Sequence, residues 1–365
     1  MPRKCMIDSS VCGLWRPKKP EAYSVCFPSP IAIGASGDPE IARKMAALVA
    51  QSAAEERIPL LLTPVINRAY SRTAPEERSL CFSDDLDLNL RMLIVWTEGL
   101  QANGVGAVLN LLPSEDSDEM QALREISQRV KVCAYHAING NMPTLAEARK
   151  AARAYRKRPE EFDWGMQHHQ ARKLARRGIV LLKNEGRLLP FHGNPKIVMI
   201  GEAAETPCFR SSGLPPIVCT ETLSALQAVR SVSPVRYEKG YHEGAEQPDE
   251  GLIRDASALA AESDLAIVFL HAEGAEKSVL SLPASQEQLL MEVTKVQPKT
   301  VAVLHTDRPV ETPWLNQVQA LVVAFPGGQA GGAAVIDLLF GAVPFTGKLP
   351  IPFPSPDFRL GFGLT

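Results

Sequence analysis

The chain has 365 residues, of which 45% are hydrophobic and 22% are charged, and its formal net charge is -2. This length and composition predict a soluble globular protein with two or three domains. Because no block of lysine and arginine stands out, the charge pattern excludes a nucleic-acid partner or an anionic-membrane partner.

The cysteines and the N-terminal residues indicate the compartment. The seven cysteines are dispersed and form no Cys-x-x-Cys pair, which favours reduced thiols over a disulfide framework or a zinc site. The first residues hold too short an apolar run for a signal peptide, and no stretch approaches the roughly 18 apolar residues of a membrane span. We therefore expect a cytoplasmic protein that uses no metal and no other cofactor.

The first part of the chain alternates short apolar runs with amphipathic stretches. The runs expected to form strands are short and rich in Val, Ile and Leu: residues 4–8, 58–65, 106–112 and 130–135. Between them the pattern predicts helices at residues 38–56 and 86–103. Asp38 before Pro39 is a strong start signal for the first of these helices. Strands and helices in alternation indicate parallel pairing, in a barrel or in a doubly wound sheet.

A domain boundary is expected after a helix over residues 144–158. A polar, irregular stretch at residues 160–169 follows, and then a helix at residues 170–177. Beyond it the alternation of strands and helices restarts. The expected strands are residues 196–201, 235–238, 265–270, 300–305 and 320–325, and the expected helices are residues 252–261, 285–296 and 331–340. This pattern predicts a second open sheet with helices on both faces.

Sequence motifs in this second part are the most specific feature of the chain. Residues 171–190 end in Leu-Leu-Pro, and residues 272–283 read Ala-Glu-Gly-Ala-Glu-Lys before Leu-Pro. Further motifs are a strand and turn at residues 196–201, a glycine-rich helix start at residues 326–332, and the Leu-Phe-Gly and Gly-Lys-Leu-Pro runs within residues 339–350. Together these motifs resemble the second domain of glycoside hydrolase family 3, the family of β-glucosidases and β-N-acetylglucosaminidases.

The resemblance implies that Glu273 is the general acid/base of a retaining glycosidase. Such enzymes use two carboxyl groups roughly 5–5.5 Å apart, one as nucleophile and one as acid/base. Glu273 follows an expected strand, so its loop would lie at the carboxyl edge of the sheet, where open α/β sheets bind ligands. The family's Tyr-Asp-Arg is replaced here by residues 275–277, Ala-Glu-Lys, which keeps the charges and loses the aromatic ring. The alternative is that Glu273 is a solvated loop carboxylate.

Residues up to about position 113 resemble the family's barrel domain. The resemblance implies that Asp8, at the end of the first strand, holds sugar hydroxyls, and that Arg78 contacts the sugar. The alternatives are an aspartate at a fraying strand end for Asp8, and an ion pair with Asp84 or Asp85 for Arg78.

The strand at residues 106–112 departs from the family pattern. Asn110 and Leu111 stand where family members have a Lys-His pair that donates to substrate hydroxyls. An amide and a hydrocarbon remove charge-assisted hydrogen bonds, each worth roughly 1.5–3 kcal/mol. Asn110 remains a candidate substrate contact, in a site that should bind sugar more weakly in the usual mode.

No aspartate stands where the family places its nucleophile. Residues 132–136 and 141–143 resemble later barrel segments, so the shortness of the first part indicates an internal deletion. The one string similar to the family's nucleophile motif is Phe-Asp-Trp-Gly at residues 162–165. Asp163 is therefore a candidate for a relocated nucleophile, and the alternative is a linker residue near the start of the next helix.

The resemblance implies an α/β protein with an incomplete parallel (β/α) barrel-like domain at residues 1–159. A linker and helix at residues 160–190 would lead to a doubly wound α/β sandwich domain at residues 191–365. The expected function is hydrolysis of terminal β-linked sugars, with impaired catalysis because no nucleophile is identified. The alternative is an inactive homologue that binds carbohydrate or serves as a partner subunit. Since an incomplete barrel leaves strand edges to be covered, a homo-oligomer is a further hypothesis.

Overall fold

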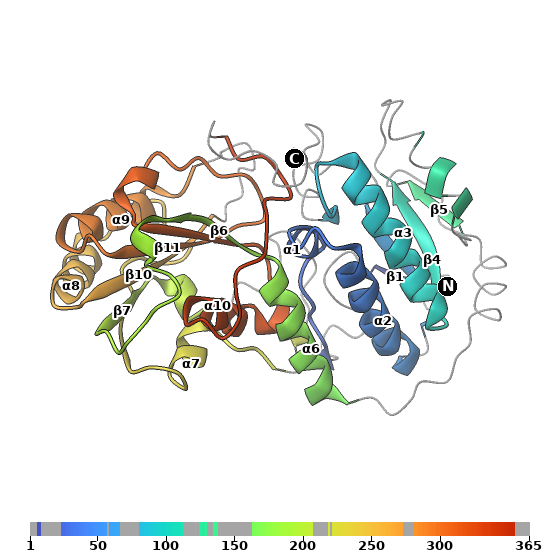
Figure 1. Cartoon of the computed structure of the whole chain (residues 1–365), viewed down its shortest axis with the longest axis horizontal. Helices are drawn as coiled ribbons and strands as arrows, with labels where there is room; N and C mark the ends of the chain where they lie inside the picture. Colours follow the sequence, from blue (N-terminus) through green and yellow to red (C-terminus); the bar gives the residue numbers. More distant parts are fainter. Residues whose placement is uncertain are drawn as a thin grey trace.

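The structure, a computed structural model, consists of two parts, each built on its own β-sheet (Figure 1). It describes residues 6–8, 23–56, 58–65, 80–111, 121, 124–126, 128–129, 134–137, 163–206, 218–219, 221–272 and 281–354. A short parallel pair, β2 (Tyr23–Ser24) with β8 (Val218–Cys219), joins a segment of the first part to a segment of the second.

The N-terminal part contains a four-stranded parallel sheet with the strand order β1-β3-β4-β5. These strands are Met6–Asp8, Leu60–Val65, Gly106–Leu111 and Ala134–Ala137. The helices of this part are α1 (Pro30–Gly34), α2 (Pro39–Glu55) and α3 (Leu86–Ala102). A core that includes Met45, Leu93 and Trp96 holds α2 and α3 together with the sheet. The parallel α/β alternation expected for this part is therefore confirmed, whereas a barrel stays a proposal.

Capping aspartates explain where the two long helices of this part begin. The Asp38 carboxylate accepts a hydrogen bond from the backbone N–H of Glu40, and Pro39 occupies the first helical position. The Asp85 carboxylate accepts from two backbone N–H groups of the first turn of α3. Each cap satisfies N–H groups that have no partner within the helix, and its charge opposes the helix dipole. Both helices thus begin where the sequence predicted them.

The C-terminal part contains a six-stranded mixed sheet with the strand order β6-β12-β11-β10-β7-β9. These strands are Ile179–Asn184, Ala320–Ala324, Thr300–His305, Leu265–His271, Ile197–Ile200 and Val235–Glu238. All neighbours are parallel except β6, which runs antiparallel to β12 at the edge. The sequence analysis expects this domain to start at residue 191, which is after β6. Because β6 is the edge strand of the sheet, the sheet begins earlier in the chain than expected.

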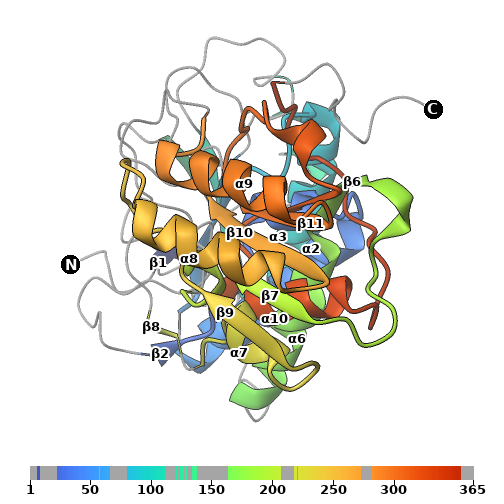
Figure 2. The ribbon, with the colours of Figure 1, turned by 90° about the vertical axis from the view of Figure 1, so that its left-hand side faces the viewer.

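Helices cover both faces of the six-stranded sheet (Figure 2). The helices α8 (Glu250–Ala261) and α9 (Ala284–Val296) share one hydrophobic cluster, and α7 (Ala225–Val229) and α10 (Gly331–Leu339) share another. Along β10, Leu270 belongs to the cluster of α8 and α9, whereas its neighbour Phe269 belongs to that of α7 and α10. Side chains alternate between the faces of a strand, so a strand buried on both faces is apolar throughout. The α/β sandwich architecture expected for this part is confirmed.

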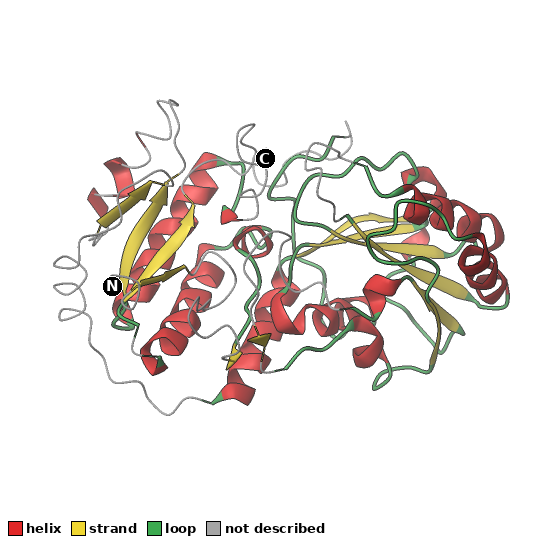
Figure 3. Ribbon diagram, turned by 180° about the vertical axis from the view of Figure 1, so that it is seen from behind, coloured by secondary structure: helices red, strands yellow, loops and turns green. Residues whose placement is uncertain are grey.

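The helix α6 (Trp164–Arg177) lies between the two sheets (Figures 1 and 3). It begins earlier than the predicted helix at residues 170–177 and includes most of the stretch expected to be irregular. The reason is its cap, because the Asp163 carboxylate accepts a hydrogen bond from the backbone N–H of Met166 at 3.0 Å.

Contacts of α6 tie the two parts together. On one side, Gln167 Nε2 donates to Gln51 Oε1 of α2 at 2.8 Å. On the other side, Arg172 and Arg176 both bind the buried carboxylate of Asp337 in α10. The bridging position expected for this helix is therefore what the structure shows.

Candidate active site at the carboxyl ends of β10 and β11

Two adjacent parallel strands end side by side in histidines. His271 ends β10, His305 ends β11, and the two residues are partners in the register. The backbone N–H of Ala272 then donates to the carbonyl of His305 at 2.9 Å. Glu273 follows directly, and its loop, residues 273–280, lies outside the described residues. The parallel direction places Ala272, the last described residue before this loop, at the carboxyl edge of the sheet.

The backbone at the start of the loop is fully hydrogen-bonded. The side-chain amide of Gln286 accepts from the N–H of His271 at 2.7 Å and donates to its carbonyl at 3.0 Å. The guanidinium of the buried Arg308 donates to the carbonyl of Ala272 at 3.0 Å. With the bond from Ala272 to His305, every backbone donor and acceptor of residues 271 and 272 has a partner. These two residues therefore hold a fixed position ahead of Glu273.

The imidazole of His271 forms a short contact with a carboxylate from another loop. Its Nδ1 lies 2.6 Å from Oε1 of Glu243, and both side chains are largely buried. Glu243 is itself held, because its backbone N–H donates to Oε2 of Glu202 at 2.6 Å. Burial raises the pKa of Glu202, but hydrogen bonds from Lys239 and from this N–H outweigh burial and leave the pKa below its usual value. The edge of the sheet thus carries an ordered network of charged groups.

His305 is buried in the same edge as a neutral group. It is 5% exposed, and its ring stacks on that of Phe269 with 6.0 Å between the centroids. Burial, together with the neighbouring His271, lowers the pKa of His305 to about 3. Within the described part of the chain, its Nδ1 has no hydrogen-bond partner. An imidazole with so low a pKa is uncharged at neutral pH, so His305 does not serve as an imidazolium acid there.

Two predicted substrate contacts lie at the corresponding edge of the smaller sheet. Asp8 is the last residue of β1 and pairs with Leu62 in β3. Asn110 lies near the end of β4 and pairs with Val65 of β3 and His136 of β5. Because all four strands are parallel, the structure brings Asp8 and Asn110 to one edge.

The remaining predicted site residues divide into two groups. Arg78 and Glu273 lie outside the described residues. Asp163 is exposed and caps α6. This structural role agrees with the alternative that Asp163 is a linker residue near the start of the helix. The structure therefore does not bring Asp163 into the network at the end of β10.

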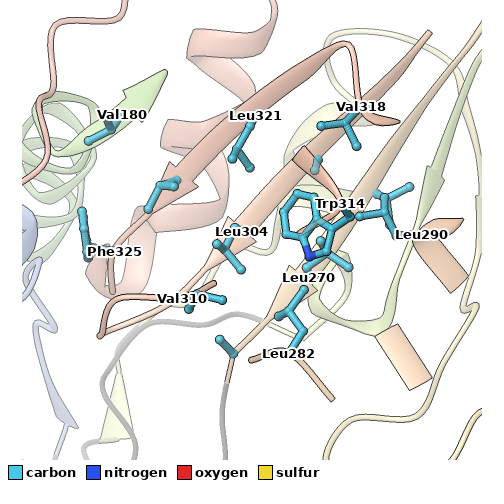
Figure 4. Close-up of a cluster of buried hydrophobic side chains, with 14 of the residues drawn as sticks. Val180, Leu270, Leu282, Leu290, Leu304, Val310, Trp314, Val318, Leu321 and Phe325 are labelled. Atoms are coloured by element: carbon cyan, nitrogen blue, oxygen red, sulfur yellow. The ribbon is translucent and has the colours of Figure 1, made fainter. Parts of the chain in front are cut away.

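One buried hydrophobic cluster includes residues from both strand edges. It includes Val65 at the end of β3, together with Ala272 and Leu282, which flank the Glu273 loop. Figure 4 shows its part in the larger sheet, where Leu282 lies close to Leu270 of β10. Polar contacts add to this junction, since the Ser83 hydroxyl donates to the carbonyl of Pro350 at 2.8 Å. Residues at both strand edges thus belong to one buried cluster.

Sequence reasoning missed the residues that organise this edge. Gln286 belongs to a motif of the resemblance, but nothing in the motif indicates that it holds the backbone of His271. Glu243 lies in a polar loop with no motif, and Arg308 follows a strand end without any distinguishing pattern. Their partners are 15, 28 and 36 residues away in the sequence, so only the fold reveals the contacts.

The described residues hold neither a metal-binding cluster nor a membrane-spanning helix. In the described ranges, no three His, Cys, Asp or Glu side chains are grouped as metal ligands would be. Within the same ranges, none of the helices combines the length and the apolar character needed to cross a membrane.

Comparison with known proteins gives one family model and several relatives. Residues 179–360 match the family model described as glycosyl hydrolase family 3 C-terminal domain. The thermostable beta-glucosidase B of Acetivibrio thermocellus is 26% identical over 436 residues, which include 91% of this chain and 58% of that protein. The exo-alpha-(1->6)-L-arabinopyranosidase of Bifidobacterium longum is 30% identical over 211 residues, 53% of this chain and 28% of that protein.

The chain therefore spans less than two thirds of these relatives. The alignment to the thermostable beta-glucosidase B, at 436 residues, is longer than the 365-residue chain, so parts of that protein stand opposite gaps.

Solved structures of similar fold cover nearly the whole chain. A GH3 beta-glucosidase from Bifidobacterium adolescentis superimposes with a TM-score of 0.79 at 21% identity, over 95% of this chain and 66% of that chain. A beta-glucosidase from Kluyveromyces marxianus, solved in complex with glucose, gives 0.81 at 15% identity, over 96% and 74%. The family model, the relatives and the shared fold all indicate glycoside hydrolase family 3.

Proposed function

We propose that the chain is a β-glycosidase that hydrolyses terminal β-linked sugars, with impaired catalysis and with Glu273 as its acid/base. The observation that carries the proposal is the fixed backbone of His271 and Ala272 at the carboxyl edge of the sheet, immediately ahead of Glu273. This edge belongs to the domain that matches the family model. An acid/base needs such a fixed starting point, because proton transfer requires a defined position relative to the leaving oxygen.

The substrate would lie between the two strand edges, since both border the same buried cluster. Asp8 and Asn110 would contact sugar hydroxyls from the edge of the smaller sheet, and Arg78 would add a third contact. In a double displacement, Glu273 would protonate the leaving oxygen and then activate water. A second carboxylate would have to attack the anomeric carbon.

Impaired catalysis is proposed because of the nucleophile and the altered strand β4. Asp163, the one candidate nucleophile, is engaged as a helix cap. Leu111 and Asn110 take the place of the donors expected on β4. The alignment to the thermostable beta-glucosidase B is longer than this chain, as an internal deletion would make it. Loss of a nucleophile usually removes several orders of magnitude in rate.

The same observations favour a second candidate function. In this alternative, the chain is an inactive homologue that binds carbohydrate or serves as a partner subunit. The capping role of Asp163 is the specific observation in favour of this alternative. Because the carboxylate stabilises the start of α6, its presence requires no catalytic role.

The two functions are distinguished by chromophore release from aryl β-glucoside, β-xyloside and β-N-acetylglucosaminide. We expect slow turnover by the wild type and a fall of at least about a hundredfold in Glu273→Gln. Glu276→Gln is the matched control in the same loop and should retain the wild-type rate. Turnover that is equal in wild type and Glu273→Gln on every sugar would contradict hydrolysis, and binding of glucose measured by calorimetry would then support the alternative.

A further variant tests the nucleophile. Asn caps helices about as well as Asp, so Asp163→Asn keeps the start of α6 while it removes the carboxylate charge. If Asp163 only caps the helix, Asp163→Asn retains both activity and stability. A loss of activity with unchanged thermal unfolding would identify Asp163 as the nucleophile.

The hypothesis of a homo-oligomer is retained as a proposal. In the described four-stranded sheet, the outer strands β1 and β5 each pair with one strand only. Their free edges support a homo-oligomer, because a second subunit could cover them. Sedimentation equilibrium measures the mass directly, and a monomeric mass would refute it.

A further inference from the structure

The helices α2 and α6 lie side by side and form a groove between them (Figure 1). The groove has a volume of about 500 Å³, within the range of small-molecule sites, and is partly open to solvent. Beyond one end Gln167 Nε2 donates to Gln51 Oε1, and at the other end an η nitrogen of Arg177 lies 3.9 Å from the Asp38 carboxylate. These contacts join the start of each helix to the end of the other, so the helices run antiparallel. The groove follows them for about 15 Å, the rise of α6 between its two contact residues.

The floor of the groove is apolar, because each helix lines it with one face. On α2 the lining residues Ile41, Lys44 and Leu48 recur at the spacing of one helix face, and on α6 Leu174 and Arg177 do the same. Ile41 and Leu174 are buried, and Leu48 is half-buried. A ligand in the groove would therefore meet hydrocarbon along its body.

Three cationic side chains border this floor, Lys44 from α2 and Lys173 and Arg177 from α6. Both lysines are exposed, and among the described residues neither has a carboxylate within ion-pair distance. The Asp38 carboxylate, at 3.9 Å, is beyond hydrogen-bond range of Arg177, whose buried Nε has no partner in the same described ranges. Three cations and one carboxylate leave two positive charges unmatched. Because cations that line one groove repel one another, an anion placed among them would be held there.

We propose that the groove between α2 and α6 binds a small organic anion that consists of an apolar body and a phosphate or carboxylate head. The body would cover Leu48 and Leu174, and the head would accept charge-assisted hydrogen bonds from Lys44, Lys173 and Arg177. The apolar floor selects against an inorganic anion, and the unmatched cations select against a neutral molecule. No residue that lines the groove belongs to the candidate active site, so this binding is independent of the proposed hydrolysis.

The first test is calorimetric titration of the full chain with ethyl, butyl and hexyl phosphate. We expect the affinity to rise with chain length, by up to about fourfold for each methylene that enters the groove. Inorganic phosphate offers the charge without the body, and hexanol offers the body without the charge. Both should bind at least about tenfold more weakly than hexyl phosphate. Titration with hexanoate compares the two heads, and the tighter ligand identifies the head that the cations prefer.

The second test removes the cations. The double variant Lys44→Gln, Lys173→Gln keeps long polar side chains at two exposed positions, and it should bind hexyl phosphate at least about tenfold more weakly than the wild type. Lys299→Gln is the matched control, because it removes an exposed lysine charge outside the groove and should bind as the wild type does. Melting temperatures without ligand show that each variant is folded. Hexyl phosphate should raise the melting temperature of the wild type and of Lys299→Gln more than that of the double variant.

Three outcomes would overturn the proposal. The first is a wild type that binds neither hexyl phosphate nor hexanoate. The second is equal affinity in the wild type and the folded double variant, because the anion would then be held elsewhere. The third is inorganic phosphate that binds as tightly as hexyl phosphate, because the apolar floor would then contribute nothing. Turnover of aryl glycosides plays no part in these measurements, so a failure of the proposed function leaves them unaffected.

Discussion

The strongest stability prediction concerns Asp337, whose carboxylate joins α10 to α6. The side chain is 7% exposed and accepts three hydrogen bonds from two arginines. Arg172 donates through Nε at 2.8 Å and through an η nitrogen at 2.7 Å, and Arg176 donates through Nε at 2.6 Å. The hydrogen bond to Asp337 outweighs burial and raises the pKa of Arg172, so this guanidinium stays charged.

The change Asp337→Ala leaves two guanidinium groups without their carboxylate. Removing one partner of a buried ion pair costs about 3–5 kcal/mol. The two arginine side chains are 30% and 21% exposed, so water solvates them in part and the lower end applies. We expect a loss of about 3 kcal/mol, which lowers the melting temperature by roughly 6–12 °C for a unit of this size.

The assay is urea unfolding followed by circular dichroism, with a matched control at the surface. Glu262 forms an ion pair with Arg236 at 2.8 Å but is 70% exposed. Glu262→Ala should therefore cost less than about 1 kcal/mol. Equal losses in the two variants would refute the reasoning, because burial of the Asp337 carboxylate would then contribute nothing.

Two further predictions follow from buried groups. The pKa of His305 is about 3 in the folded state and near 6.5 when exposed. Between pH 3 and pH 6.5 the unfolded state therefore binds a proton that the folded state does not bind. The free energy of unfolding should therefore be undiminished above pH 6.5 and should fall by up to about 1.4 kcal/mol for each pH unit below 6.5. Unfolding curves of His305→Phe should show a smaller acid-induced loss. Gly34→Ala places a Cβ only 1.5 Å from the carbonyl oxygen of Phe82 and should cost at least about 2 kcal/mol in chemical denaturation. Gly165→Ala, whose Cβ meets its nearest atom at 3.4 Å, should instead gain about 0.5–1 kcal/mol, and equal effects would contradict the packing argument.

Local signals in the sequence determined most of the secondary structure. The helices that begin after Asp38 and Asp85 were predictable because a capping carboxylate acts within its own first turn. The strands at residues 235–238 and 300–305 have the predicted bounds, since an apolar run between breakers is also a local pattern. The family resemblance was likewise visible in the motifs after residue 170, and residues 179–360 match the family model.

Contacts between distant segments were decided by the tertiary structure alone. The strand β6 pairs antiparallel with β12, and nothing in residues 179–184 indicates a partner so far along the chain. Asp163 has the same neighbours in sequence whether it caps α6 or serves as a nucleophile, and only the bond to Met166 identifies the cap. Glu243 meets His271 across 28 residues because β9, β7 and β10 are adjacent in the sheet. Periodicity and capping are encoded over a few residues, whereas a site at a sheet edge depends on the order in which strands assemble.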